Sequence, residues 1–264
     1  MKIKILAIGD IVGRPGRDII KQKLPELIQT HRIDFTVVNA ENVAGGSGVT
    51  PETLNELLSY GINALTSGDH IWKRKEIIPE LTRTDRLIRP ANYPAEAAGK
   101  GYTILETANR SPIAVVNLVG RTFMPSPANC PFHAIDQILT ELSTRTKVIV
   151  VDAHMEATSE KIALGWYLDG RVSFVFGTHT HIQTADECIL PRGTAYITDV
   201  GMTGPYDSVL GRKKEQVLAA FTTGMPNRFE VATDNIRLGG AIVTIDTETG
   251  HATSIERVML RLKD

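Results

Sequence analysis

Apolar segments that each end in polar residues recur through most of the chain. They read as buried strands at residues 3–10, 34–42, 62–70, 111–121 and 147–157. Helix patterns follow most of them, at about 14–31, 51–60, 73–81, 133–145 and 158–168, and a further strand begins near residue 172. Strands that alternate with helices are typical of βαβ units, whose strands pair in parallel. The chain is therefore predicted to be an α/β protein.

The last third of the chain has a different pattern. Segments 194–201, 228–233 and 239–260 alternate apolar and polar residues, and Glu248, Thr249 and Gly250 read as a hairpin turn. We expect antiparallel strands here that close a second sheet. Because no linker, repeat or low-complexity segment divides the chain, we expect a single domain over residues 1–264.

The composition is that of an ordinary globular protein. Hydrophobic residues make up 42% of 264 residues, and the net charge is -1, so no extended nucleic-acid surface is expected. The two cysteines, Cys130 and Cys188, match neither a zinc spacing nor a redox pair. The apolar start is short and interrupted by Asp10, and no segment reaches membrane-spanning length. We expect a cytoplasmic protein with no membrane part.

Two histidines stand one residue apart at the end of the run VSFVFGTHTHIQTAD, residues 172–186. If the chain stays extended past Gly177, the side chains of His179 and His181 point the same way. Neutral imidazole is the commonest protein ligand for a metal ion. The pair is therefore a candidate metal site, and two polar residues in a turn are the ordinary alternative.

Other polar residues stand where the predicted strands end. They are Asp10, Glu41, Asn42, Asp69, His70 and His154. In α/β sheets, ligands bind beyond the carboxyl ends of the strands, where loops from neighbouring strands converge. Together with the two histidines, this set is too large for one ion and suits two adjacent metals that share a carboxylate. Mixed nitrogen and oxygen ligands suit iron, manganese, zinc or cobalt and do not rank them.

Each of these residues also has an ordinary structural role open to it. Asp10 and the pair Asp69–His70 could cap helices, Glu41 and Asn42 could be solvated loop residues, and His154 could be a core histidine. The metal hypothesis accounts for all of them at once. Competing motifs fail, because the first glycines lack the G-x-G-x-x-G spacing, residues 45–50 lack a P-loop lysine, and no G-x-S-x-G elbow occurs.

The strand-end motifs resemble those of calcineurin-like metallophosphoesterases. In chain order they are GD (9–10), NAEN (39–42), GDH (68–70), DAHMEATSEK (152–161) and GTHTHIQTAD (177–186). Further segments resemble the bacterial YmdB-like branch: GDIVGRPGRD (9–18), RPANYP (89–94), NLVGRTFM (117–124), ATSEKIALGWYLDGR (157–171) and AYITDVGMTGPYDSVLG (195–211). The resemblance implies a four-layer α/β/β/α sandwich, a dinuclear metal centre and hydrolysis of phosphodiesters, notably 2′,3′-cyclic nucleotides.

The family pattern also implies ligands. By that pattern, Asp10, Glu41, Asn42 and His181 hold one metal, and Glu41, Asp69, His154 and His179 hold the other. Val12 stands where many relatives have a histidine, and Asn42 supplies the replacement ligand in the YmdB-like branch. Asp69 replaces the usual asparagine and adds a negative charge, which leaves the metal preference open. The family favours iron, with manganese or zinc as alternatives.

The same resemblance implies a mechanism. A hydroxide shared by the metals attacks phosphorus, and His70 protonates the departing ribose oxygen as general acid, leaving a 3′-nucleotide. Arg121 is expected to contact phosphate, with a surface role equally open, and Tyr206 is expected to stack on a base. The expected partner is a small-molecule cyclic nucleotide or another phosphodiester, and a homo-oligomer is compatible with the sequence.

The sequence leaves two other interpretations. Amidohydrolase barrels also carry an H-x-H pair, but there it follows the first strand, whereas here it follows a late one. A nucleotide-sensing or regulatory binding protein with the same fold and little turnover is the second alternative. The pair Asp69–His70 favours retained catalysis.

Overall fold

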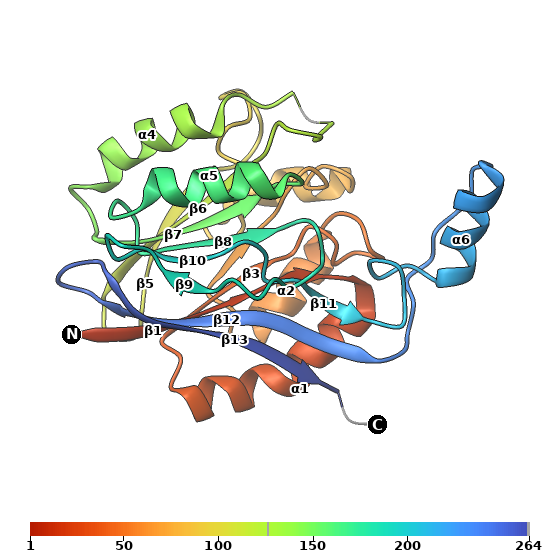
Figure 1. Ribbon diagram of the computed structural model, residues 1–264, viewed down its shortest axis with the longest axis horizontal. Coiled ribbons are helices and arrows are strands. Elements are labelled where there is room, and N and C mark those ends of the chain that lie inside the picture. The colour runs from red at the N-terminus through yellow and green to blue at the C-terminus, as the bar shows by residue number, and fades with distance from the viewer. Residues whose placement is uncertain (126, 263–264) are drawn as a thin grey trace.

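Two β-sheets packed face to face form the centre of the protein (Figure 1). The computed structural model describes residues 1–125 and 127–262. The first sheet has the order β2-β11-β12-β1-β3-β4, with β13 beside β12. Its strands are β1 (Lys2–Ile8), β2 (Asp10–Ile11), β3 (Phe35–Asn39), β4 (Ala64–Thr66), β11 (Met202–Pro205), β12 (Ile236–Asp246) and β13 (Ala252–Arg261).

The second sheet has the order β5-β6-β7-β8-β10-β9. Its strands are β5 (Tyr102–Glu106), β6 (Pro112–Val119), β7 (Val148–His154), β8 (Phe174–Thr178), β9 (Cys188–Ile189) and β10 (Ala195–Ile197). The helices are α1 (Gly13–His31), α2 (Pro51–Ser59), α3 (Ile78–Arg83, after a 3₁₀ turn at Lys75–Ile77), α4 (Pro131–Leu142), α5 (Thr158–Leu168) and α6 (Lys214–Thr223). Within the described ranges, no helix is both long and apolar enough to cross a membrane.

Three apolar clusters hold four layers together. On β1, Ile5 and Ala7 face the second sheet, while Leu6 and Ile8 face the helices on the outer side, as the two-residue repeat of a strand requires. The middle cluster is completed from the second sheet by residues such as Phe174. The outer clusters join the first sheet to α1 and α2, and the second sheet to α4 and α5. The expected four-layer α/β/β/α sandwich is therefore confirmed.

The helix predictions are largely confirmed. α1 has Pro15 in its first turn, and Thr50 and Thr53 form a capping box at the start of α2, whose first residue is Pro51. The helix expected at 73–81 is shorter and begins as a 3₁₀ turn. β5 and α6 were not predicted. α6 projects from the body (Figure 1), with Val217 as its buried residue.

The predicted arrangement of the tail is wrong in three respects. Strand β10 lies parallel to β8, with Ala195 opposite Phe174, rather than antiparallel. Residues 228–233 form no strand, because only an isolated bridge at Val231 gives them a partner. The hairpin β12–β13 joins the first sheet beside β1 rather than closing the second. A two-residue repeat shows that a strand has two different faces, but it does not show which sheet receives the strand.

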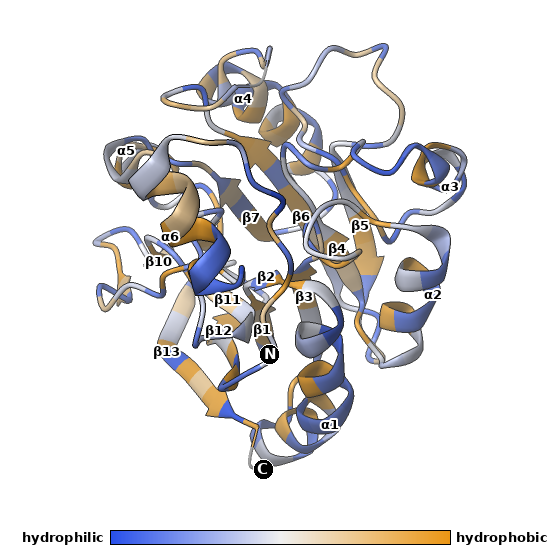
Figure 2. Cartoon of the chain, turned by 90° about the vertical axis from the view of Figure 1, so that its right-hand side faces the viewer, coloured by the Kyte–Doolittle hydropathy of each residue, from blue (hydrophilic) through white to orange (hydrophobic). Residues whose placement is uncertain are grey.

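The parallel strands of both sheets end on the same side of the molecule. β1, β3 and β4 are parallel neighbours in the first sheet, and β6, β7 and β8 are parallel neighbours in the second. Figure 2 looks onto these strand ends, with α4 and α5 on one side of the sheets and α1 on the other. Ligand sites of α/β proteins lie at such an edge.

Candidate metal centre

Four side chains from different strand ends meet at this edge. Glu41, Asp69, His154 and His179 each offer one ligand atom, and these atoms all lie within 4.8 Å of one another. Glu41 follows β3 and Asp69 follows β4, while His154 ends β7 and His179 follows β8. This is the set that the family pattern assigns to one metal.

The remaining expected ligands lie beside Glu41. Nδ2 of Asn42 lies 3.0 Å from Oε1 of Glu41 and 3.1 Å from Nε2 of His181. Oδ1 of Asp10 lies 3.9 Å from the same nitrogen of His181. The structure therefore brings all seven predicted ligands together, with Glu41 between two groups. In this arrangement the amide nitrogen of Asn42, rather than its oxygen, faces Glu41. That these residues bind metal stays a prediction.

The turn that carries the two histidines is not extended. β8 ends at Thr178, and the backbone φ angles of His179 and His181 are 92° and 65°. The expectation of an extended chain past Gly177 is therefore wrong. Left-handed conformations of this kind cost about 1–3 kcal/mol each for residues other than glycine, and the surrounding structure has to hold them.

The carboxylate of Asp199 stabilises this turn through hydrogen bonds. Its Oδ2 accepts hydrogen bonds from the backbone N–H of Thr180 at 3.3 Å and from the Thr180 hydroxyl at 2.7 Å. Nζ of Lys161 donates to the same oxygen at 2.6 Å. Oδ1 of Asp199 accepts from the N–H of Gly201. Sequence reasoning missed both Lys161 and Asp199, although each lies in a segment that carries the family resemblance.

Hydrogen bonds fix which nitrogen each histidine turns toward the cluster. Thr178 donates its proton to Asp152, so its oxygen accepts from Nδ1 of His154 at 2.9 Å. The carbonyl of Leu210 accepts from Nδ1 of His181 at 3.1 Å. Nε2 of His154 thus faces the carboxylates of Glu41 at 3.2 Å and Asp69 at 3.3 Å. Nε2 of His181 keeps a lone pair, which accepts from Nδ2 of Asn42. Outer hydrogen bonds of this kind orient histidine ligands in metal sites.

His179 turns Nδ1, rather than Nε2, toward His154. Its Nε2 lies 3.2 Å from a carboxylate oxygen of Glu156, and its Nδ1 lies 3.0 Å from Nε2 of His154. Two imidazole nitrogens that face each other at this distance repel through their lone pairs unless a proton or a cation lies between them. The geometry of the histidine pair therefore fits a shared cation.

The pKa shifts show how strongly the groups of the centre interact. Burial raises the pKa of Glu41, but the charge and hydrogen bond of His154 outweigh it and lower that pKa to about 2. Burial lowers the pKa of His154, but Glu41 and Asp69 raise it well above its usual value. Burial and the charge of His154 lower the pKa of His179 to about 4.

One carboxylate oxygen of Asp10 lacks a partner within the described chain, while the other accepts from the backbone N–H of His179. Asp10 is fully buried, and its Oδ1 has no hydrogen-bond partner among the described residues. Burial, together with Glu41 and Asp199, raises the pKa of Asp10 well above its usual value, although His154 opposes the shift. A buried carboxylate oxygen without a donor is costly unless a cation compensates it. The residues of this centre therefore fit metal ions.

Gly68 leaves the space that the centre needs. A Cβ atom at this position would collide with Nε2 of His154 and Oε2 of Glu41. The loop after β4 can therefore approach the ligands only because residue 68 has no side chain.

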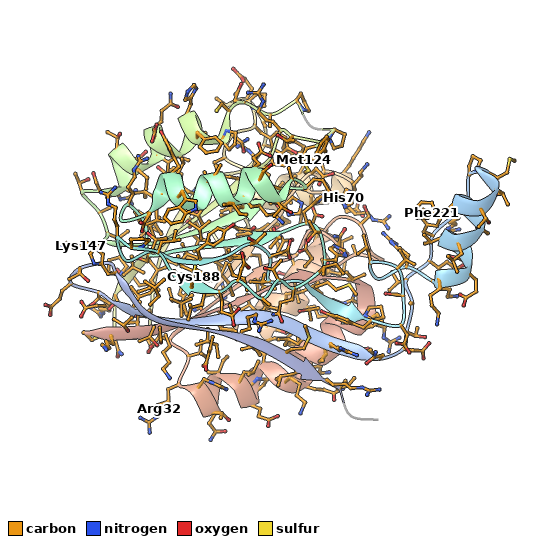
Figure 3. All side chains as sticks on the ribbon, viewed as in Figure 1. Arg32, His70, Met124, Lys147, Cys188 and Phe221 are labelled. Carbon is orange, nitrogen blue, oxygen red and sulfur yellow. The ribbon has the colours of Figure 1, made fainter. Side chains whose placement is uncertain are left out.

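His70 lies at the open side of the centre. Its Nδ1 lies 2.8 Å from Oδ1 of Asn42, and its Nε2 lies 3.7 Å from Oδ2 of Asp69. The backbone N–H of His70 donates to Oε2 of Glu41. The side chain is 29% exposed, and Figure 3 shows it on the side of the sheets that faces α6. His70 can therefore reach a bound substrate.

A cleft of about 290 Å³ opens over the centre. It is lined by Glu41, Asn42, Gly46, His70, Glu156, His179, Thr180, His181, Leu210 and Arg212. The guanidinium of Arg212 donates to the carbonyls of Gly45 and Phe229 at 3.3 Å and to that of Gly46. Burial alone accounts for its lowered pKa, and no carboxylate of the described chain pairs with it. Sequence reasoning did not single out Arg212.

The two predicted substrate contacts do not line this cleft. Arg121 is exposed, and its backbone N–H donates to Glu160. The Tyr206 hydroxyl donates to the carbonyl of Met202, and its ring lies under the guanidinium of Arg237. Their role as substrate contacts stays a prediction.

A model of the YmdB-like protein family matches residues 6–258. The chain belongs to this family. It is 49% identical over 258 residues to a 2′,3′-cyclic-nucleotide 2′-phosphodiesterase of Bacillus subtilis (strain 168), covering 98% of this chain and 97% of the relative.

Two solved structures of similar proteins have the same fold. A hypothetical protein from Thermus thermophilus matches with a TM-score of 0.91 and 38% identity, over 98% of this chain and 99% of that one. A phosphatase from Mycoplasma pneumoniae matches with a TM-score of 0.93 and 34% identity, over 99% and 94%. The similarity to these two proteins thus extends over the whole fold.

Proposed function

We propose that the protein is a metal-dependent phosphodiesterase that opens 2′,3′-cyclic nucleotides at the 2′ ester bond and leaves 3′-nucleotides. The observation that carries this proposal is the convergence of carboxylates and imidazoles around Glu41 at the strand ends. The name of the Bacillus subtilis relative supports the substrate class and the bond.

Asp10, Asn42 and His181 are proposed to hold one cation, and Asp69, His154 and His179 the other, with Glu41 shared between them. Two bound cations supply Lewis-acid chemistry and a water-derived nucleophile at neutral pH. The family resemblance favours iron, and manganese and zinc suit the same donors. The orphaned oxygen of Asp10 and the facing nitrogens of His154 and His179 support this assignment.

His70 is proposed to act as the general acid. Asn42 holds the ring at Nδ1. When the Asn42 amide turns its oxygen toward the cation, Nδ2 donates to Nδ1 of His70 instead, and the proton of the ring is carried on Nε2. The proton passes from Nε2 to the departing 2′ oxygen of the ribose. Proton transfer by a positioned side chain contributes about 10²–10⁴-fold to the rate.

Arg212 is proposed to attract the substrate anion. It is a cation in the wall of the cleft, and its hydrogen bonds go to backbone carbonyls rather than to a carboxylate. Its charge is therefore available to a phosphate that enters the cleft. Arg121 and Tyr206, which lie outside the cleft lining, are weaker candidates for substrate contact.

Product analysis tests this function directly. Metal-loaded protein is incubated with 2′,3′-cyclic AMP, and the products are separated by chromatography. We expect 3′-AMP, formed only without chelator, and no product from Glu41→Ala protein prepared in the same way. Formation of 2′-AMP would contradict the proposed bond. Binding of the nucleotide without turnover would instead support the regulatory binding protein.

A further inference from the structure

A second cavity, of about 930 Å³, lies away from the metal centre. Its walls come from the segment 85–101, strand β5, residues 129–130, helix α4 and Arg145, and it shares no lining residue with the cleft. We call it the β5 cavity. Its volume falls in the range of about 300–1,000 Å³ that is typical of small-molecule sites.

Partly buried apolar side chains at the edge of the core line one side of the β5 cavity. β5 is the edge strand of the second sheet (Figure 2), and α4 packs mainly on the neighbouring strand β6. Tyr102 and Ile104 on β5, and Ala134 and Ile138 on α4, are therefore only partly buried against the third apolar cluster. They offer an apolar surface between a helix and a strand.

The back wall comes from the segment RPANYP, which the metal centre does not use. Arg89 is only 6% exposed. Its Nη1 donates to the carbonyl of Pro90 at 2.8 Å and its Nη2 to that of Ala97 at 3.2 Å. Its Nε–H has no acceptor among the described residues. A buried guanidinium without a carboxylate partner is costly unless an anion lies nearby.

Three of the Lys, Arg and Asp side chains that line the β5 cavity are cations, and one is a carboxylate. Lys100 and Arg145 line it with Arg89, and Asp85 is the carboxylate in the lining. Lys100 pairs with Asp85, and Arg145 with Glu141 at 3.6 Å. Arg89 is therefore the cation of this lining that has no carboxylate partner among the described residues. The lining as a whole favours an anionic ligand.

We propose that the β5 cavity is a second ligand site, which binds a small organic anion with a planar ring, of the size of a mononucleotide. The anionic group lies toward Arg89 and Lys100, and the ring lies against Tyr102 and Ile104. Aromatic and aliphatic side chains of this kind hold planar rings. The proposal does not depend on the reaction at the metal centre.

Equilibrium dialysis with 5′-AMP and adenosine tests the anion preference. Wild-type metal-loaded protein is compared with Glu41→Ala protein, in which the metal centre is disrupted. We expect a saturable 5′-AMP site that persists in Glu41→Ala, and at least about tenfold weaker binding of adenosine. Absence of saturable binding, loss of binding in Glu41→Ala, or equal affinity for adenosine would each overturn the proposal.

Variants that fill the cavity test its location. Ala134→Trp, or Gln137→Trp if the first fails to fold, is expected to weaken 5′-AMP binding at least about tenfold and to leave hydrolysis of 2′,3′-cyclic AMP at the parental rate. Thr140→Trp, at an exposed position of α4 outside the lining, is the matched control and should bind like the parent. Unchanged binding in the filled variants would place the ligand elsewhere.

A second copy of the chain is the competing occupant. Sedimentation of the parent and of Ala134→Trp decides between the two. Equal assembly states together with lost 5′-AMP binding support the ligand site. Dissociation of an oligomer by Ala134→Trp, with no nucleotide binding in the parent, would make the cavity an interface and overturn the proposal.

Discussion

Nζ of Lys161 lies 2.6 Å from Oδ2 of Asp199, and both side chains are 1% exposed. The same carboxylate holds Thr180, the residue between His179 and His181. A buried ion pair thus stands directly behind the strained turn that presents two of the proposed ligands. Helix α5, which carries Lys161, is in this way connected to the metal centre.

Removing Lys161 should weaken both the fold and the centre. Lys161→Met leaves the Asp199 carboxylate buried without its cation, which costs about 3–5 kcal/mol for pairs of this kind. We expect a lower free energy of unfolding in urea, and less bound metal per chain by elemental analysis. Lys147→Met, at an exposed lysine, is the control and should change neither. Parental stability and metal content in Lys161→Met would show that the pair does not support the turn.

Glu41 should be the ligand whose loss matters most. Because it lies between the two groups of side chains, Glu41→Ala is expected to lose both metals rather than one. Asp69→Asn, which restores the residue usual in the wider family, keeps an oxygen ligand and should retain them. Elemental analysis after gel filtration checks this. Two ions per chain in Glu41→Ala would refute the bridging role.

His70 should affect turnover without affecting metal content. His70→Gln removes the proton donor while the proposed ligands remain, so hydrolysis of 2′,3′-cyclic AMP should fall about 10²–10⁴-fold. Metal content should equal that of the parent, and this measurement serves as the internal control. A metal-replete variant with the parental rate would show that another group, or water, protonates the ribose oxygen.

The carboxylate of Asp186 should make the free energy of unfolding depend on pH in the acidic range. Oδ1 of Asp186 accepts from the Thr184 hydroxyl at 2.6 Å and from the backbone N–H of Thr198 at 3.2 Å. Burial raises the pKa of this carboxyl, but these hydrogen bonds outweigh it and lower the pKa below its usual value. The stabilisation is therefore complete above an unfolded-state pKa of about 3.9, and is lost as the pH falls through the folded-state pKa.

The variant Asp186→Asn removes this titration. The difference in free energy of unfolding between the parent and Asp186→Asn should be largest near neutral pH and should shrink below about pH 4. Urea unfolding at several pH values measures it, with Asp234→Asn at an exposed position as control. A difference that stays constant down to about pH 3 would contradict this account.

The strand ends could be predicted because their signal is local. An apolar run followed at once by Asp10, Glu41 or His154 indicates both a buried strand and its end, and the parallel pairing brings such ends together. The family resemblance then divided the residues between two metals. Neither the strand-end pattern nor the family resemblance indicated the φ angles of His179 and His181. The backbone of this turn donates hydrogen bonds to the carboxylates of Asp10 and Asp199, which belong to other segments of the chain.

Other features depended on tertiary contacts that no local pattern contains. Lys161 reads as a surface lysine on a helix, and its burial becomes apparent only when Asp199 lies behind it. The hairpin β12–β13 alternates in the same way whichever sheet it joins. Helix α6 has Val217 as its buried residue. Because little of this helix packs against the core, its sequence shows only a weak helical repeat of apolar residues.

The central claim is that Glu41 joins two ions held by side chains from both sheets. Anomalous X-ray diffraction from crystals of the metal-loaded, active protein measures this directly. We expect two peaks, one bordered by Asp10 and His181 and the other by Asp69 and His154, with Glu41 touching both. A single peak, or peaks remote from Glu41, in crystals of protein that hydrolyses 2′,3′-cyclic AMP would contradict the account.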